Sequence, residues 1–586
     1  MHWQGTTRRD FLKQAAGLGL LTLAPPLMSS CAGGAFRGHL PDARPLLDPE
    51  TAENIASVLW LDQYDPRKIP PEIAARLRSA ANSPQAFGAR MRTRIDELLA
   101  NPQSFTPDYT ERYNTLKAYS AELTPHQAYA INTMLGLDSA LGYQELPKDI
   151  TFSFPEDDRP WFEYQTGWHF FVGSAFTAAG DEYGVQLMFW QAALLPAPMA
   201  EQVGLSTLEN QIVEIHFAIS RAGDRHYRAK PYVVAGTTGL ISFTPEPFNY
   251  AVGKNVMRSL QPGSLFPIQL RAWGKDNTQG DDVTIEIDLT LNQTKGYVLN
   301  GDQGLAPSCG GVGTLYYSVP NLRLDPAASV LRIDGQAAQL ASGKFWYDHQ
   351  WGTGFMPGGD PFPEVLRAAS RLAAPDPGGW DWLAIQFDDD TELTLSALHT
   401  NDNAQFYGQT GPEAPGVMTA ACNGSYIAAS GEYLPVEGQI QVTKWIRSTI
   451  AHGQYMATDT WYPDRVEVSL DTAAVPENRR VFAMVPIVDS GQQGFFASGP
   501  QYSEGAVYIE DPDGAKIGRG FLESPGYADE ANQRLQLAGM PQTEEMRALI
   551  APAEISAELR AASAAFLADP AHQALFVQEY ASCRGL

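Results

Sequence analysis

Two short segments of the chain place titratable side chains among large aromatic rings. Residues 343–353 read G-K-F-W-Y-D-H-Q-W-G-T and residues 379–382 read G-W-D-W, so Asp348, His349 and Asp381 each lie within two residues of a tryptophan. Apolar surroundings raise the pKa of a carboxyl group, and aromatic faces can hold a hydrophobic molecule or a carbocation. The two segments therefore indicate acid–base chemistry on a hydrophobic substrate.

The chemistry that fits these residues best is protonation of a carbon–carbon double bond. Adding water to an isolated alkene requires an acid that stays protonated, aromatic faces for the cation and a positioned water. Asp381, with tryptophan on both sides, is the candidate acid. His349 is the candidate base for the water, and Trp351 falls on the same strand face as His349. Asp348 is also a catalytic candidate. It faces the side of the strand opposite to His349 unless the strand contains a bulge.

A structural role is the alternative for the same residues. Near the start of a barrel strand, a tryptophan, an acid and a histidine can hydrogen-bond to the backbone and close the barrel. The candidate substrate-binding residues are Trp346, Trp380, Trp382 and Glu163. Of these, the structural role is the stronger explanation for Glu163.

The elements that must position these residues are strands. Between residues 150 and 530 apolar and polar residues alternate, as in the run V-T-I-E-I-D-L-T-L from residue 283, which is typical of half-buried antiparallel strands. The segment from residue 150 to residue 530 is too long to form one ordinary barrel. We therefore expect two lobes, residues 150–335 and 336–530.

Helical periodicity flanks this β region. Ile55, Val58 and Leu59 recur at helical spacing within residues 48–149, which predicts a helical domain, and residues 531–586 predict C-terminal helices. Residues 32–47 are rich in Gly, Pro and Ala and predict a linker.

The N-terminus carries an export signature. Residues 7–13 read T-R-R-D-F-L-K before a short apolar run, which resembles a twin-arginine signal, and M-S-S-C at residues 28–31 resembles a lipobox. Residues 1–31 are therefore expected to be a lipoprotein signal. The mature protein would be periplasmic and anchored to a membrane through a lipid on Cys31.

Composition excludes several classes of function. The chain of 586 residues has a net charge of −26 and no basic stripe, so nucleic acid is not an expected partner. The sequence contains no G-x-S-x-G, H-E-x-x-H or nucleotide-binding glycine motif, which predicts neither a metal nor a cofactor. Cys309, Cys422 and Cys583 show no C-x-x-C spacing.

Six blocks in sequence order resemble the bacterial carotenoid 1,2-hydratase (hydroxyneurosporene synthase) family and its AttH-type secreted relatives. In order, they are W-F-E-Y-Q-T-G from residue 161, Y-G-V-Q-L-M-F from residue 183, Y-Y-S from residue 316, D-H-Q-W from residue 348, G-W-D-W from residue 379 and G-R-G-F-L-E from residue 518. The resemblance implies a mainly β fold with two lipocalin-like barrel lobes. It also implies a hydratase-type lyase acting on a hydrophobic, isoprenoid-like substrate, with roles for His349, Trp351 and Asp381.

Two functions remain open at this point. One is an exported hydratase or isomerase, and the other is a lipoprotein that only binds or carries a lipophilic ligand. An arrangement in which Asp381 and His349 face one apolar cavity would favour the enzyme.

Overall fold

The computed structural model describes the centre of the chain. The described residues are 144, 146–147, 150–193, 206–208, 211–236, 239–301, 303–309, 312–353, 379–448, 459–489, 491–495 and 501–528. The expected signal (1–31), linker (32–47), C-terminal helices (531–586) and nearly all of the helical domain (48–149) lie outside them. In the described part no helix is long and apolar enough to cross a membrane.

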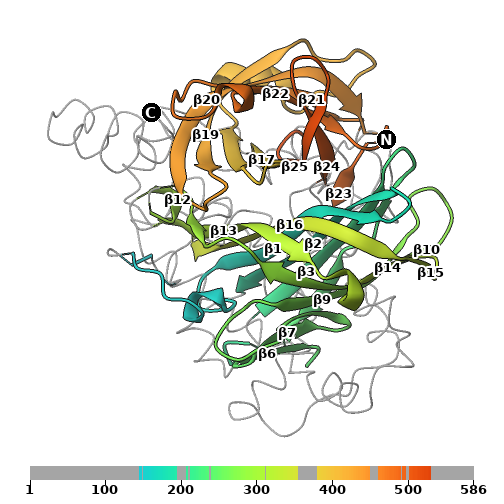
Figure 1. Cartoon of the computed structure of the whole chain (residues 1–586), viewed down its shortest axis with the longest axis vertical. Helices are drawn as coiled ribbons and strands as arrows, with labels where there is room; N and C mark the ends of the chain where they lie inside the picture. Colours follow the sequence, from blue (N-terminus) through green and yellow to red (C-terminus); the bar gives the residue numbers. More distant parts are fainter. Residues whose placement is uncertain are drawn as a thin grey trace, which may run out of the picture.

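Within the described residues the first lobe is a 16-stranded antiparallel sheet (Figure 1). Along its main path the strands follow the order β4-β3-β2-β1-β16-β13-β10-β9-β8-β7-β6. The strands are β1 (Thr166–Thr177), β2 (Glu182–Ala193), β3 (Gln211–Arg221), β4 (His226–Arg228), β5 (Tyr232–Ala235), β6 (Ile241–Pro245), β7 (Phe248–Val252), β8 (Asn255–Ser259), β9 (Ile268–Asp276), β10 (Val283–Gln293), β11 (Val298–Leu299), β12 (Leu305–Cys309), β13 (Val312–Leu324), β14 (Val330–Ile333), β15 (Gln336–Ala338) and β16 (Leu340–Thr353).

The second lobe is a closed antiparallel barrel. Its nine described strands follow the order β22-β21-β20-β19-β18-β17-β25-β24-β23, and pairing of β22 with β24 closes the ring. The strands are β17 (Trp380–Phe387), β18 (Glu392–Leu398), β19 (Met418–Ile427), β20 (Tyr433–Arg447), β21 (Trp461–Leu470), β22 (Val481–Pro486), β23 (Gln493–Phe495), β24 (Gln501–Glu510) and β25 (Lys516–Ser524).

Helical structure is limited to short 3-10 turns in the part of the chain that is described, which confirms the expected mainly β architecture there. These turns are η3 (Glu156–Asp158), η5 (Pro326–Ala328), η6 (Asn401–Phe406) and η7 (Glu477–Arg479).

The first sheet curls around its own core. Lys230, just after β4, donates its backbone N–H to the carbonyl of Lys275 on β9 at 3.2 Å, which brings distant parts of the sheet together. The enclosed core includes Phe171, Tyr317 and Tyr347. Because side chains alternate along a strand, the residues next to these core residues in the sequence face the outside of this lobe.

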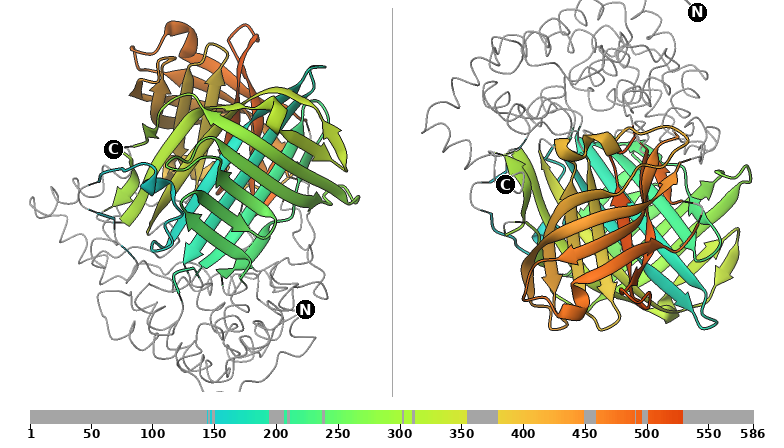
Figure 2. Two further views of the ribbon diagram at one scale, coloured as in Figure 1. Left: turned by 60° about the horizontal axis from the view of Figure 1, so that its bottom comes forward. Right: turned by 90° about the horizontal axis from the view of Figure 1, so that it is seen from above.

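That outer face packs against the second lobe. Figure 2 shows the second lobe (orange to red) lying against the first sheet. An apolar cluster between the lobes joins Phe170 and Trp346 of the first sheet to Trp382 and Phe521 of the second. The rings of Phe170 and Trp382 lie 5.6 Å apart.

The division between the lobes differs from the expected boundary at residues 335 and 336. β16 pairs with β1 and β13, so residues up to Thr353 belong to the first sheet. The second sheet begins at Trp380. Alternation shows that a segment is a strand but does not show which sheet it joins, and for this reason the sequence placed β16 in the wrong lobe.

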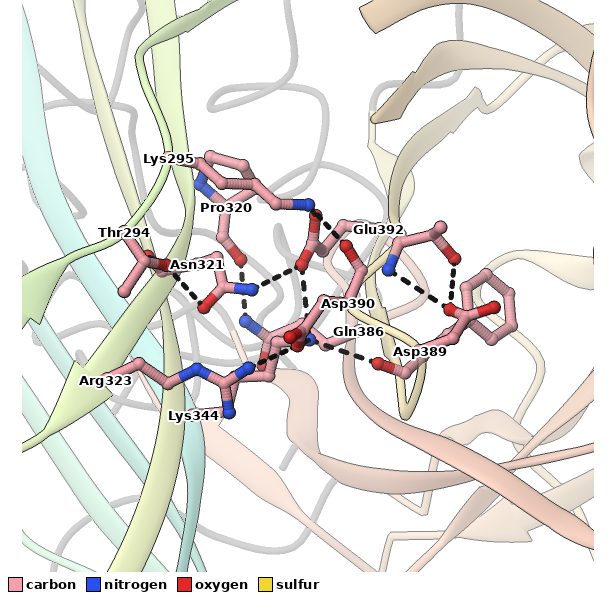
Figure 3. Close-up of polar contacts among 12 residues, drawn as sticks. Thr294, Lys295, Pro320, Asn321, Arg323, Lys344, Gln386, Asp389, Asp390 and Glu392 are labelled. Carbon is pink, nitrogen blue, oxygen red and sulfur yellow. Dashed lines mark hydrogen bonds and ion pairs between the residues drawn. The ribbon is translucent and has the colours of Figure 1, made fainter. Parts of the chain in front are cut away.

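Ion pairs fasten one edge of the interface, with the pairs of Glu392 buried and that of Arg323 exposed (Figure 3). Lys295 of the first lobe donates to the Glu392 carboxylate of β18 at 2.5 Å, and Lys344 of β16 lies 3.2 Å from it. Asn321 of β13 donates a further hydrogen bond to Glu392 at 2.7 Å. Arg323 pairs with Asp390 in the turn before β18. The β17–β18 hairpin is therefore held by charge against the first sheet.

Candidate active site in the first lobe

The structure distributes the predicted site residues among four places. His349 and Trp351 lie in the core of the first lobe, and Asp381 lies in the barrel of the second. Glu163 is on the surface, where Arg159 donates to it at 3.1 Å. The remaining candidates lie at or beside the interface between the lobes: Trp346, Asp348, Trp380 and Trp382.

Asp381 is fixed by side chains of the second barrel. Ser524 Oγ donates to one carboxylate oxygen at 2.6 Å and Tyr527 Oη to the other at 3.0 Å, and His399 Nε2 lies 3.6 Å away. The expectation that Asp381 and His349 act in one site is therefore wrong. Trp380 and Trp382 face the opposite side of β17, so they do not form the surroundings of the Asp381 carboxyl.

Asp348 organises the interface. Its carboxylate accepts hydrogen bonds from Tyr316 Oη, Ser318 Oγ and Trp346 Nε1, each at 2.5 Å. Tyr316 Oη in turn accepts from Trp382 Nε1 of the second lobe at 3.1 Å. Burial raises the pKa of Asp348 to about 7. With three donors on one carboxyl group, Asp348 fastens the lobes and is not positioned as a free acid.

Two neighbouring histidines lie among aromatic side chains in the packed core of the first lobe, and this buried cluster of side chains is called the chamber below. His169 of β1 is the cross-strand partner of His349 of β16, and their ring centroids are 3.8 Å apart. Trp351 lies 4.5 Å beyond His349, on the same face as the sequence predicts. Burial lowers the pKa of His169 to about 3 and that of His349 well below its usual range. Both imidazoles are therefore uncharged at neutral pH.

Asp158 supplies the chamber with an acid that the sequence did not reveal. It ends the 3-10 turn η3, where Tyr317 Oη lies 2.6 Å from one carboxyl oxygen and Tyr297 Oη 3.1 Å from the other. Burial raises the pKa of Asp158 to about 7, although the hydrogen bonds with the two tyrosines lower that pKa. A carboxyl with this pKa is partly protonated at neutral pH and can donate a proton.

Two tyrosines lie between the acid and one histidine. Tyr317 Oη lies 2.6 Å from the Asp158 carboxyl, the ring centroids of Tyr317 and Tyr347 are 6.0 Å apart, and Tyr347 Oη lies 2.7 Å from His169 Nδ1. No motif in the sequence could reveal this arrangement, because 159 positions separate Asp158 from Tyr317.

Aromatic walls surround these groups. Trp161 stacks on Trp351 at 5.7 Å, and Phe152 meets the edge of Trp351 at 5.9 Å. Five of the buried polar atoms that find no hydrogen-bond partner among the described residues lie here: Trp161 Nε1, His169 Nε2, Tyr250 Oη, His349 Nδ1 and Trp351 Nε1. Unpaired polar atoms are expensive to bury, which makes this cluster a candidate place for a ligand or water.

Metal binding has no candidate in the described part of the chain. No group of three or more His, Cys, Asp or Glu side chains there is arranged to hold a metal ion. The chamber instead combines a proton donor, neutral bases and aromatic surfaces.

Several known proteins are similar to this chain. A family model described as AttH-like matches residues 145–527. No curated protein matches the sequence significantly. A crystal structure of an AttH protein from Nitrosomonas europaea is similar at 18% identity and a TM-score of 0.47, covering 66% of this chain and 99% of that one. Kievitone hydratase from Nectria haematococca is similar at 14% identity and a TM-score of 0.41, covering 66% and 96%.

Proposed function

Because this chain belongs to the AttH-like family, we propose that it is an acid–base enzyme of the hydratase or isomerase type, acting on a carbon–carbon double bond of a hydrophobic substrate. The observation that carries this proposal is the shared chamber of Asp158, His169 and His349 in the first lobe. Family membership agrees with the resemblance found in the six sequence blocks. The mechanism keeps His349 and Trp351 in the predicted site and replaces Asp381 by Asp158 as the acid.

The reaction begins with proton transfer from Asp158. The π electron pair of the substrate forms a C–H bond with that proton, and the adjacent carbon becomes a cation. Tyr317 and Trp351, whose rings lie 6.1 Å apart, supply aromatic faces for the cation. In a hydration, water attacks the cation through its oxygen, and a neutral imidazole takes the proton that the water loses. In an isomerisation, the imidazole takes a proton from carbon instead.

A test of this function uses two matched aspartates. Native mass spectrometry of protein purified from membranes identifies the bound molecule, which is then incubated with protein in heavy-oxygen water. In a hydration the oxygen label enters the product, and in an isomerisation it does not. In either case we expect Asp158→Asn to lower product formation at least about a hundredfold, because the amide cannot donate an acidic proton.

Asp348→Asn is the control for this experiment. Both carboxyls are buried and both have a pKa raised to about 7, but Asp348 lies outside the chamber. Each substitution should cost about 1–3 kcal/mol of stability through weakened hydrogen bonds. If Asp158→Asn keeps turnover, Asp158 is not the acid and the proposed mechanism fails. If the molecule is bound but never converted, the protein is a lipophilic-ligand carrier and the enzyme proposal fails.

We also propose that the protein works at a membrane outside the cytoplasm, which is supported by the T-R-R-D-F-L-K segment and Cys31. Replacing Arg8 and Arg9 by Lys should leave precursor in the cytoplasm. Cys31→Ala should move the exported protein from the membrane fraction to the soluble fraction. Retention of Cys31→Ala on washed membranes would contradict a lipid anchor at this residue.

A further inference from the structure

A strap of chain lies over the chamber at one end of the first lobe. The strap is residues 150–164, which come just before β1 and contain the turn η3 but no strand. Phe152 meets the edge of Trp351 at 5.9 Å, and Trp161 stacks on the same ring at 5.7 Å. Trp351 pairs with the second residue of β1, near the end of β16. The strap therefore covers the end of the lobe at which β1 begins and β16 finishes.

The chamber is sealed while the strap is in place. His169, His349 and Trp351 each have an exposed fraction of 1%, so a molecule from solution cannot touch them. Their strands β1 and β16 are hydrogen-bonded to each other and to the strands on either side. Entry between these strands would break backbone hydrogen bonds along a ladder. A substrate of the proposed reaction therefore needs another element to move.

Side chains, and not a backbone ladder, hold the strap to the lobe. In the described part of the chain its backbone-to-backbone hydrogen bonds stay within the strap, as from Tyr164 N–H to the Trp161 carbonyl at 3.2 Å. The polar contacts that leave it are a hydrogen bond of 2.8 Å from Gln211 Nε2 to the Phe162 carbonyl and those of the Asp158 carboxyl. Its other contacts with the lobe are aromatic. The strap can therefore lift without breaking any strand pairing.

The Asp158 carboxyl is the polar latch of the strap. Tyr317 Oη and Tyr297 Oη contact its two oxygens at 2.6 Å and 3.1 Å. In the described part of the chain no lysine, arginine or histidine forms an ion pair with it, and the other titratable groups that face it are Glu156, Asp157 and Tyr347. None of these supplies a positive charge. A buried carboxylate without a cation is costly, so the closed strap favours the protonated acid.

We propose that the strap is a pH-dependent lid on the chamber, latched by Asp158, which opens when this carboxyl is ionised and admits a hydrophobic substrate to His349 and Trp351. The use of the lid by a substrate rests on the proposed function. The opening itself can be measured without any ligand.

The direction of the pH dependence follows from the burial of the latch. Burial raises the pKa of Asp158 to about 7 in the closed strap, whereas a solvated aspartate has a pKa of about 3.9. Between these values the closed strap binds more protons than the open strap. Opening should therefore become more favourable as pH rises from about 4 to 7, and it should level off above pH 7.

Hydrogen exchange of the full-length protein, read by mass spectrometry of peptides, measures the opening. Rates are divided by those of an unfolded peptide of the same sequence, which removes the intrinsic effect of pH on exchange. From pH 5 to 6.5 we expect the opening constant of residues 150–164 to rise at least about tenfold, because one proton is released on opening. Protection of β1 should stay within about threefold over the same range.

Three variants assign the effect to the latch. Asp158→Asn cannot ionise but keeps partners for both tyrosines, so the opening constant should stay low at each pH. Tyr297→Phe removes one hydroxyl from the latch and should raise the opening constant several-fold. Glu163→Gln is the matched control, because this partly exposed carboxyl of the same strap pairs with Arg159 and not with the lobe. Its pH dependence should equal that of the unmodified protein. A pH dependence that survives in Asp158→Asn, or a strap that exchanges only together with β1, would overturn the proposal.

A second measurement asks whether opening exposes the chamber. Diethyl pyrocarbonate modifies neutral imidazoles that it can reach, and peptide mass spectrometry locates the modified residues. At pH 6.5 we expect His169 and His349 to react at least about tenfold more slowly in Asp158→Asn than in the unmodified protein. His216 of β3, which also has an exposed fraction of 1%, should react equally in both. Equal rates for the chamber histidines would overturn the lid, and this result would be independent of the turnover test.

Discussion

Two buried glutamates show how partners decide the charge of a residue. Glu392 and Glu504 have exposed fractions of 0% and 1%. Glu392 lies within 3.2 Å of two lysine ammonium groups, which offset part of the effect of burial on its pKa. Glu504 faces Glu523 on the neighbouring strand, and burial raises its pKa well above the usual range. Burial raises the pKa of Glu392 as well, but its two ammonium partners favour the carboxylate, whereas Glu504, which faces a second carboxyl group, favours the neutral acid.

Replacing each of these residues by glutamine should separate the two cases. Glu392→Gln leaves the buried ammonium group of Lys295 without its carboxylate, and we expect a loss of about 3 kcal/mol. Glu504→Gln resembles the neutral acid and keeps an oxygen for the Gln186 amide, so the change should stay within about 1 kcal/mol. Urea unfolding at neutral pH measures both, and equal losses would show that the two carboxyls have the same charge.

At the residue scale, the sequence named two residues of the candidate site, His349 and Trp351, but pointed to Asp381 and not to Asp158 as the acid. Alternation along a strand correctly predicts that His349 and Trp351 share a face and that Asp348 does not. The same rule explains the error at Asp381, because tryptophans next to it in sequence point away from it. Asp158 lies in a short turn, and only long-range folding brings it to Tyr317. No local pattern could predict that contact.

At the scale of elements, local alternation was sufficient to find strands. The run from residue 283, where the sequence predicts a strand, forms β10 (Val283–Gln293). Pairing between distant strands was not predictable, because it depends on which faces bury each other after the chain has folded. The position of β16 between β1 and β13 is the clearest example.

At the scale of the whole molecule, buried acids and buried histidines give opposite dependences of stability on pH. Burial raises the pKa of Asp158, Asp348 and Glu523 to about 7, so between about pH 4 and 7 the folded protein binds more protons than the unfolded chain. Their contribution to stability therefore falls as pH rises through 7. Burial lowers the pKa of four histidines, so their contribution falls as pH drops below about 6.5; they are His169, His216, His226 and His349.

The two effects together predict greatest stability at mildly acidic pH. From about pH 8 to 6.5 we expect the free energy of unfolding to rise by roughly 2 kcal/mol, because three carboxyls take up protons in the folded state. Below about pH 6.5 the histidines become protonated in the unfolded chain, which should cancel any further gain in the free energy of unfolding. Denaturant unfolding across this pH range measures the curve. The double variant Asp348→Asn, Glu523→Gln should flatten the alkaline limb, and a stability that rises steadily toward pH 8 would contradict this assignment.

The pairing of β1 with β16 has a consequence for biosynthesis. His169 and its partner Tyr347 are 178 positions apart, so the chamber cannot form until β16 has left the ribosome. At usual elongation rates the edge of β1 waits on the order of ten seconds for its partner. An unpaired strand edge can join other chains during this interval. We therefore expect the nascent first lobe to be most prone to association with other chains until residue 353 has emerged.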